Sequence, residues 1–368
     1  MKDLIQDIGK KKLLMIVGGI VGIIVLIIII LLLYNAFFKK NSYSAVEDKV
    51  LNAAINYYED NPKLLPKNIN DEVSINSTTL TAGEYLKSLD ELVPDENVNC
   101  TATVTVTNIN NNYRYVTKLK CGEVYTTKTL VDKIKEDSPI VISGQGLYEM
   151  NGELVYRGDN PNNNVKFANH NWKIVKVENN QVMLILKDKL TRVTWDDRFN
   201  VDRNQDDGVN DYSVSRVNDY LTNLYNSDTL FDGENKLTIA AHNLYIGKRS
   251  SDISYNDGSI EKSEVLENKY IGLLPLFDYI NASLDSNCYS ASTQSCSNYN
   301  YLADTEYNWW TMTGNADTTH KVYRISSDGK ITMSRAVTSI YARPVIYLAK
   351  DAIYVSGNGT LDNPYIVK

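Results

Sequence analysis

The chain has 368 residues, of which 43% are hydrophobic and 23% charged, and its formal net charge is −7. This composition is that of a globular protein and argues against an intrinsically disordered one. Six of the 38 basic residues lie in the first 40 positions, so the remainder of the chain is strongly acidic. An acidic surface repels phosphate backbones, which argues against nucleic-acid binding.

Residues 13–33 form the most hydrophobic segment and contain no charged side chain. At about 1.5 Å per helical residue, this length spans a hydrocarbon core of about 30 Å. Residues 10–12 are lysines, and the positive-inside rule then favours a cytoplasmic N-terminus. We therefore expect a single-pass protein of the cell membrane, with residues 1–40 as tail and transmembrane anchor and the C-terminal portion extracellular. A G-x-x-x-G pattern, Gly18 to Gly22, would allow self-association through this helix.

The segment after the apolar run has the pattern of a small α+β domain. Apolar residues recur at helical spacing over residues 43–60. Residues 102–106 and 113–119 alternate between apolar and polar side chains, which predicts two strands of a hairpin. The order of an apolar helix, a soluble helix and a small sheet resembles a pilin. We assign this domain to residues 41–126 and expect that it could also mediate self-association.

Four cysteines, Cys100, Cys121, Cys288 and Cys296, all follow the apolar segment. The first two lie at the ends of the predicted strands, and the last two flank one polar loop. We predict two local disulfides, Cys100–Cys121 and Cys288–Cys296, which would fit an oxidising setting outside the cytoplasm. The cysteine and histidine spacings do not match those of a zinc site.

Residues 127–145 are expected to form a linker, after which the pattern becomes rich in strands. Helical spacing recurs at 214–225 and 274–284, and residues 342–348 form a hydrophobic strand. Turn residues of the kind that two-residue hairpin loops require predict three further hairpins. These turns are Asn151–Gly152, Asn179–Asn180 and Asp328–Gly329.

Two motifs near the C-terminus are distinctive: Asn308-Trp309-Trp310-Thr311-Met312 and Ala342-Arg343-Pro344-Val345-Ile346-Tyr347-Leu348. Together with shorter pieces spread over residues 146–368, they resemble the uncharacterised domain of Firmicutes surface proteins that is related to formylglycine-generating enzymes and C-type lectins. The resemblance implies a compact mixed α+β domain with long loops, whose relatives bind carbohydrates or proteins and, in a minority, are enzymes. The late cysteines of the formylglycine-generating enzymes have no counterpart after Cys296, so that activity is not carried over. The predicted fold class is therefore α+β, with an N-terminal transmembrane helix, the small α+β domain and a C-type-lectin-like domain at 146–368.

One acidic loop has the character of a calcium site. Its candidate ligands are Asp202, Asn204, Asp206, Asp207 and Asp211. Alternating Asp and Asn oxygens followed by Gly208 suit a hard cation that takes six to eight oxygen ligands. The spacing departs from that of an EF-hand, and the alternative is a solvated acidic loop. No cofactor other than calcium is expected.

Trp309, Trp310 and Arg343 are the candidate ligand-binding residues outside that loop. The two tryptophans could form a stacking platform for a sugar. Adjacent strand positions face opposite sides of a sheet, so at least one of them is expected in the core. Arg343 precedes a proline in an apolar strand, where a buried structural ion pair competes with a role in binding a ligand.

No Walker loop, G-x-S-x-G or H-E-x-x-H motif is present, and no catalytic residues are proposed. The expected function is that of a membrane-anchored extracytoplasmic binding or adhesion module that recognises a glycan or protein ligand through loops of the C-terminal domain. One alternative is a structural subunit of a pilus-like or envelope assembly. Another is an enzyme that acts on a cell-surface substrate through an unrecognised site.

Overall fold

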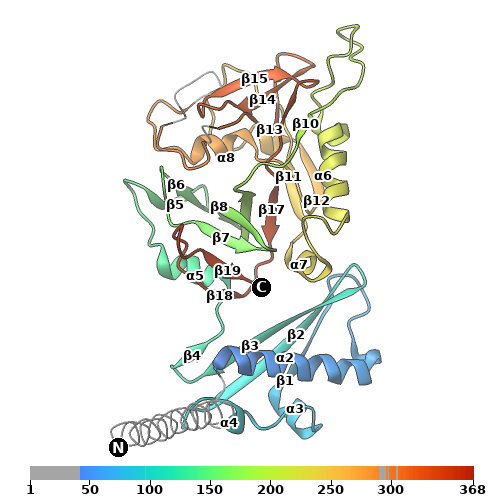
Figure 1. Ribbon diagram of the computed structural model, residues 1–368, viewed down its shortest axis with the longest axis vertical. Coiled ribbons are helices and arrows are strands. Elements are labelled where there is room, and N and C mark those ends of the chain that lie inside the picture. The colour runs from blue at the N-terminus through green and yellow to red at the C-terminus, as the bar shows by residue number, and fades with distance from the viewer. Residues whose placement is uncertain (1–41, 96, 290–295, 297, 304–305) are drawn as a thin grey trace, which may run out of the picture. The chain divides into compact units, whose positions relative to one another are not determined.

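The structure is a computed structural model that describes residues 42–95, 97–289, 296, 298–303 and 306–368 (Figure 1). The chain forms two compact units. The first comprises the residues up to 65 together with 73–105 and 117–126, and the second comprises 66–72, 106–116 and 127–368. Both units combine helices with sheets, so the α+β part of the predicted fold class is confirmed.

The predicted transmembrane helix at residues 13–33 lies outside the described residues. Within the part of the chain that the structure describes, no helix is both long enough and apolar enough to cross a membrane. The eighteen-residue helix α2, Tyr43–Asp60, has the length, but its exposed face is polar. For the described residues, the fold class is therefore corrected to α+β with no membrane-spanning helix. The single-pass localisation in the cell membrane, with a cytoplasmic N-terminus, is corrected with it.

The first unit contains helix α2 and most of a four-stranded sheet in the order β1-β2-β3-β4 (Figure 1). Residues 72, 106–109 and 112–116 of this sheet belong to the second unit. Its elements after α2 are η1 (Pro62–Leu64), β1 (Glu72–Asn76), α3 (Ser77–Ala82), α4 (Leu89–Leu92), β2 (Cys100–Ile109), β3 (Asn112–Cys121) and β4 (Tyr125–Thr126). Ser42 begins α2 by accepting a hydrogen bond from the Ala45 amide at 3.2 Å. The predicted helix at 43–60 and the predicted hairpin are both confirmed.

Two disulfides join the four cysteines as predicted, Cys100–Cys121 and Cys288–Cys296. The first joins the opening residue of β2 to the last residue of β3, so it closes the open end of the hairpin. Disulfides persist in oxidising surroundings, and these two fit an extracellular or otherwise oxidising environment.

The second unit carries most of the strands. Its elements are α5 (Leu130–Asp137), β5 (Gly146–Met150), β6 (Glu153–Arg157), β7 (Asn164–Phe167), β8 (His170–Glu178), β9 (Gln181–Leu186), β10 (Arg192–Thr194), η2 (Tyr212–Val214), α6 (Arg216–Asn226), α7 (Gly233–Thr238), β11 (His242–Tyr245), η3 (Glu261–Ser263), β12 (Val265–Lys269), α8 (Leu276–Asn281), β13 (Trp309–Gly314), β14 (Lys321–Ile325), β15 (Ile331–Arg335), β16 (Ser339–Tyr341), β17 (Val345–Leu348), β18 (Tyr354–Ser356) and β19 (Tyr365–Val367).

These strands form three sheets. An eight-stranded sheet runs β17-β9-β8-β7-β19-β18, and the β5–β6 hairpin joins it through β8. A five-stranded sheet runs β10-β16-β13-β14-β15, and β11 pairs with β12. The three predicted hairpins are confirmed, and the backbone explains why their turn residues suit them. Asn151 and Gly152 have φ values of 51° and 81°, and Asn179 and Asn180 have 51° and 60°, the left-handed region that such turns require.

In the described part of the second unit, buried side chains form two hydrophobic clusters, and strand β8 contributes to both. Trp172 and Ile174 belong to one cluster, and Val175 belongs to the other. The predicted helices at 214–225 and 274–284 correspond to α6 and to the shorter α8. Helix α6 begins with Ser215, whose hydroxyl accepts a hydrogen bond from the Asn218 amide.

Candidate functional site

The two adjacent tryptophans lie in the core, on opposite sides of β13. Neither Trp309 nor Trp310 has exposed surface, and they belong to different hydrophobic clusters. The Trp310 indole donates a hydrogen bond to the Val193 carbonyl at 3.1 Å. Neither ring has a free face on which a sugar could stack, so this geometry favours a structural role for both.

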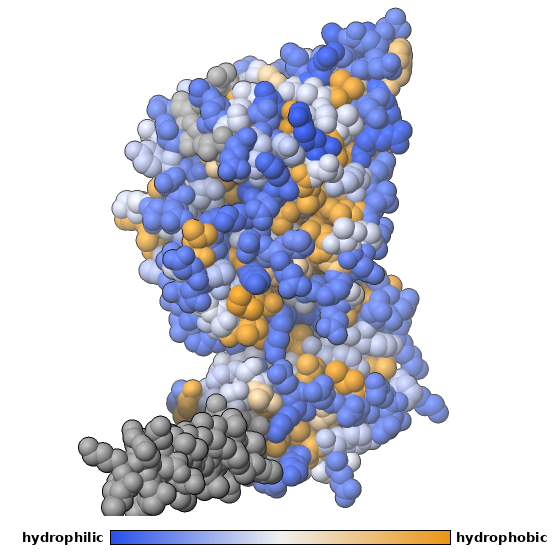
Figure 2. Space-filling view, viewed as in Figure 1, coloured by the Kyte–Doolittle hydropathy of each residue, from blue (hydrophilic) through white to orange (hydrophobic). Residues whose placement is uncertain are grey.

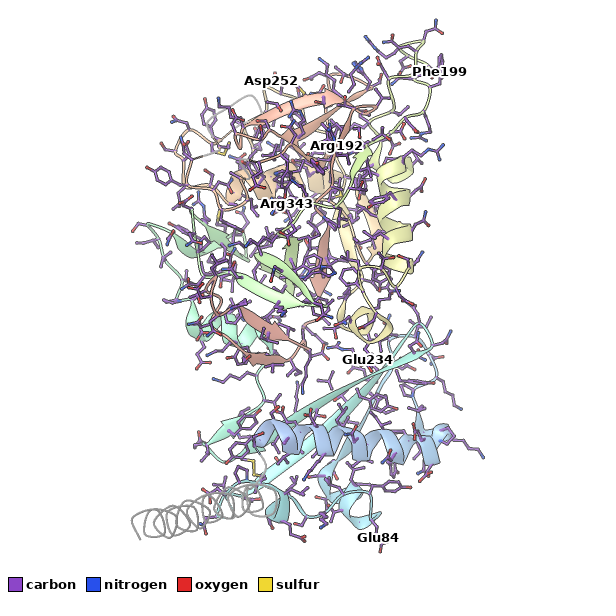
Figure 3. All side chains as sticks on the ribbon, viewed as in Figure 1. Glu84, Arg192, Phe199, Glu234, Asp252 and Arg343 are labelled. Carbon is purple, nitrogen blue, oxygen red and sulfur yellow. A yellow bond between two sulfur atoms is a disulfide. The ribbon has the colours of Figure 1, made fainter. Side chains whose placement is uncertain are left out.

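Arg343 is buried as well and lies in the interior of the second unit (Figure 3). Its guanidinium donates to the backbone carbonyls of Leu186 and Leu302 and lies 4.9 Å from the ring centroid of Trp309. These contacts join β9 to the segment that precedes β13. The side chain therefore fixes the packing of loops onto the sheet and is not presented to a ligand.

The most distinctive surface feature is the loop of residues 195–211, hereafter the anchored loop, which connects β10 to η2 (Figure 1). Four polar side chains of this loop are almost completely buried, with exposed fractions of 0–1%: Asp196, Asn200, Asp207 and Asn210. Burial of polar groups costs free energy unless each is hydrogen-bonded. Their hydrogen bonds therefore determine how the loop is held.

Two asparagines fasten the loop to the β13–β14 connection. The Asn200 amide donates to the carbonyls of Gly208 and Thr319 at 2.7 and 3.1 Å. The Asn210 amide donates to the carbonyls of Asn315 and Thr318 at 2.8 and 2.7 Å, among others. Side-chain amides here replace the backbone pairing that a regular strand would provide.

Two aspartates hold the loop from its other side. Asp196 accepts hydrogen bonds from the amides of Arg198 and Val209 at 3.1 and 2.9 Å, which draws both ends of the loop together. Asp207 forms ion pairs with Arg203 at 3.2 Å and with Arg335 of β15 at 2.8 Å. Burial alone would raise the pKa of the Asp207 carboxyl, but hydrogen bonds from the two arginines and from Gln205 lower it.

The anchored loop also presents apolar side chains to solvent. Phe199 is 52% exposed and Val201 is 81% exposed, and they flank the buried anchor Asn200. Figure 3 places Phe199 on the part of this loop that projects from the second unit. In Figure 2 the same end of the unit is largely hydrophilic with a small hydrophobic area. The loop thus combines a fixed backbone with exposed apolar side chains.

The five candidate calcium ligands lie on this loop, but the structure does not bring their oxygens together. Asp207 points inward to the arginines, and Asp211 accepts from the amide of Ser213 at 3.0 Å at the start of η2. Asp202, Asn204 and Asp206 are exposed. Among the described residues, no group of three or more acidic, histidine or cysteine side chains is arranged to hold a metal ion.

The sequence did not predict a role for Phe199 and Val201, although they lie beside the acidic residues of the same loop. The sequence feature that marks these two residues is local: they are apolar residues in a stretch that is otherwise polar and has no strand or helix periodicity. The roles of Asn200 and Asn210 could not have been found this way, because their partners lie more than a hundred residues away along the chain.

Comparison of the chain with protein-family models, with curated proteins and with solved structures found no match in any of the three. The resemblance to the lectin-like surface domain therefore stays a prediction.

Proposed function

We propose that this protein is a disulfide-stabilised binding module that holds a protein ligand through the anchored loop. The observation that supports the proposal is the contrast between the buried anchors Asn200 and Asp207 and the exposed Phe199 and Val201. Single exposed apolar residues are common on protein surfaces. A loop of seventeen residues that is fixed by four buried polar side chains is a far more specific arrangement.

A rigid loop binds a ligand at a lower entropic cost than a mobile loop does. A ligand that docks on a mobile loop must offset the entropy of ordering it, whereas a fixed loop has already met that cost during folding. Binding residues are often carried by loops that a rigid scaffold positions. The anchored loop fits this description, since the five-stranded sheet supplies its anchor points.

The exposed groups favour a protein over a glycan. Trp309 and Trp310, the two tryptophans that could have formed a platform for a sugar, are both fully buried. Phe199 next to Val201 offers aliphatic and aromatic surface of the kind that inserts into an apolar pocket of a partner. The two disulfides are consistent with a module that works in an oxidising setting.

Site-directed photocrosslinking tests the proposal. A photoreactive phenylalanine analogue placed at position 199 of the full chain is expected to form a defined protein adduct in the producing cells. The same analogue at Val355, an exposed position on β18 of the same unit, serves as the control. The adduct at position 199 is expected to disappear when Val201 is changed to Asp.

Equal labelling from positions 199 and 355 would overturn the assignment of the anchored loop. Binding of the wild-type chain to a glycan array, lost in Phe199→Ser, would replace the protein ligand by a glycan. A circular-dichroism spectrum and a melting temperature for each variant ensure that lost binding reflects the loop surface and not unfolding.

A further inference from the structure

Lys176 of β8 is a fully buried lysine surrounded by carboxylates. Its ammonium nitrogen lies 3.0 Å from Glu153 Oε2, 3.2 Å from Glu178 Oε2 and 3.3 Å from Asp278 Oδ1. None of the Lys176 side chain is exposed, and Asp278 is 1% exposed. Burial of this many charges in one place is costly, and a stabilising role alone gives weak reason for it.

An irregularity in β8 directs Lys176 toward this cluster. The register of β8 against β9 shifts between Ile174 and Lys176, which is a β-bulge. Ile174 and Val177 both pack in one hydrophobic cluster, whereas Val175 packs in the other. Without the extra residue, Lys176 would point to the same side as Ile174. The bulge turns it to the side where Glu178 and Asp278 lie.

Asp278 differs from the two glutamates because one of its oxygens is left without a partner. Its Oδ2 is buried and has no hydrogen-bond partner among the described residues. Burial raises the pKa of the Asp278 carboxyl to about 7, against the opposing effect of Lys176 and with a further increase from Glu153 and Glu178. Part of the Asp278 population therefore carries a proton and is a neutral carboxylic acid beside Lys176. A neutral acid is an electrophile, whereas a carboxylate is not.

Glu178 is unsuited to accept a proton from this amine. Its carboxylate accepts hydrogen bonds from the hydroxyls of Tyr245 at 2.7 Å and Tyr347 at 3.3 Å, and His242 Nε2 lies 3.4 Å away. Burial alone would raise the pKa of Glu178, but His242, Lys176 and Tyr245 lower it well below its usual range. Glu178 thus stays ionised and helps to hold Lys176 in place.

Glu153 is the better proton acceptor. It lies at the shortest distance from the Lys176 nitrogen and also accepts from Lys262 at 2.7 Å. The Lys262 side chain is 30% exposed, so Glu153 lies between the buried amine and the solvent. A proton that reaches Glu153 can therefore leave the protein interior.

Aromatic rings exclude water from the pair. The Lys176 nitrogen lies 5.0 Å from the ring centroid of Phe277 and 5.8 Å from that of Tyr245. In a dry site, release of a water molecule during amide formation is favoured because hydrolysis is suppressed. The amine and the carboxyl group are held close together, which replaces a bimolecular encounter by an intramolecular one.

We propose that Lys176 and Asp278 form an intramolecular isopeptide bond after the chain has folded. Lys176 Nζ, once deprotonated, attacks Asp278 Cγ, and the new N–C bond replaces the bond from Cγ to the carboxyl hydroxyl. The hydroxyl leaves as water with one proton taken from the attacking nitrogen. No oxidant or other reactant is required.

Glu153 accepts one proton from the Lys176 ammonium in this reaction. Burial by itself would lower the pKa of the Lys176 ammonium, but the charges of Asp278, Glu178 and Glu153 outweigh burial and raise it. The amine is therefore protonated at rest, and reaction begins when Glu153 takes one proton from it. The ammonium has three protons: one ends on Glu153, one leaves in the water and one stays on the amide nitrogen.

The product would be a covalent connection from β8 of the eight-stranded sheet to helix α8. Such a connection limits the conformational freedom of the unfolded chain in the way that a disulfide does, but it resists reduction. A binding module that works outside the cytoplasm would gain resistance to heat and proteolysis. The inference is independent of the proposed binding function of the anchored loop.

Intact-mass spectrometry of the purified full chain after reduction of its disulfides tests this bond. The expected mass is that of the sequence less one water molecule. Trypsin is expected not to cleave after Lys176, and the digest should contain a branched peptide that carries both Lys176 and Asp278. An unshifted mass, with cleavage at Lys176, would overturn the proposal and leave a non-covalent ion cluster.

Substitutions distinguish loss of the isopeptide bond from loss of the fold. Lys176→Arg and Asp278→Ala are expected to show no mass loss and to melt roughly 10 °C lower than the wild type. Asp278→Asn keeps an electrophile and is expected to lose ammonia in place of water. Lys173→Arg is the matched control, because Lys173 is another buried lysine of β8 and should leave the bond intact.

Glu153→Gln keeps the shape of the side chain and removes the proton acceptor. We expect a folded protein in which most chains retain the water molecule. Complete bond formation in this variant would contradict the role given to Glu153. Loss of water in Asp278→Ala would contradict the assignment of Asp278 as the electrophile.

Discussion

Arg249 and Glu261 form a two-pronged ion pair in which neither side chain has any exposed surface. Arg249 Nε donates to Glu261 Oε1 and Arg249 Nη2 donates to Glu261 Oε2, both at 2.9 Å. The backbone of Arg249 also joins the β13–β14 connection, since its amide donates to the Gly314 carbonyl at 3.0 Å. The pair fixes the long segment between β11 and β12 against the five-stranded sheet.

Removal of one partner of this pair is expected to destabilise the folded protein strongly. Arg249→Met should lower the free energy of unfolding by about 3–5 kcal/mol, because it leaves the Glu261 charge buried and unpaired. The double variant Arg249→Met with Glu261→Leu should recover most of the loss. Urea denaturation measures the free energy of unfolding of the single and the double variant. The exposed pair Arg216–Asp197, with side-chain exposures of 57% and 55%, is the control, and its removal should cost no more than about 1 kcal/mol.

Gly208 is the residue at which the backbone of the anchored loop turns back. Its φ is +76°, and a Cβ at this position would lie 2.2 Å from the Asp196 carbonyl oxygen. Gly208→Ala is expected to lower the free energy of unfolding by roughly 2–3 kcal/mol, through backbone strain and through the clash. Gly152→Ala, where φ is +81° but no atom lies within 4 Å, should show the strain alone. Equal losses of stability in the two variants would contradict the clash.

His320 should make stability depend on pH. Burial lowers the pKa of its imidazole, and the charges of Arg203, Lys321 and Arg335 lower it further, against the opposing effect of Asp207. A depressed pKa stabilises the folded state above the unfolded value of about 6.5, and this contribution is lost as the pH falls through the folded value. His320→Gln should abolish that part of the pH dependence. The measurement is urea denaturation of both proteins at a series of pH values below neutrality.

Calcium is expected to leave the anchored loop unchanged. Asp207 is neutralised by two arginines, and Asp211 is engaged at the start of η2, so binding of the ion would require both contacts to break. Melting curves of the full chain with millimolar calcium and with a chelator should coincide. A calcium-dependent rise in melting temperature that is lost in Asp206→Asn would contradict this prediction and restore the calcium site.

Short-range features of the fold were predictable from the sequence. The turns at Asn151–Gly152 and Asn179–Asn180 require left-handed backbone, which asparagine and glycine adopt at low cost. The helix at 43–60 follows from apolar residues that recur at helical spacing. The disulfide Cys100–Cys121 follows from its place at the open end of a predicted hairpin.

The candidate site was predicted less well. Residues 202–211 present oxygen atoms at spacings that predict a group of metal ligands. This pattern carries no information about Arg335, which follows 128 residues after Asp207 and occupies its carboxylate. Trp309 and Trp310 were expected to include at least one core residue, and the structure buries both because each side of β13 faces a hydrophobic cluster.

The sequence by itself determined the periodicity of the strands and helices, the hairpin turns and the cysteine pairs, because each depends on residues that lie within a short stretch of the chain. Only the tertiary structure decided which charged side chains are buried. Lys176 and Asp278 are unremarkable in the sequence, and they come within 3.3 Å because a bulge in β8 and the packing of α8 bring them together. The free energy of a buried charge depends on all the groups around it, and those around Lys176 come from separate segments of the chain that include β6, β11 and α8.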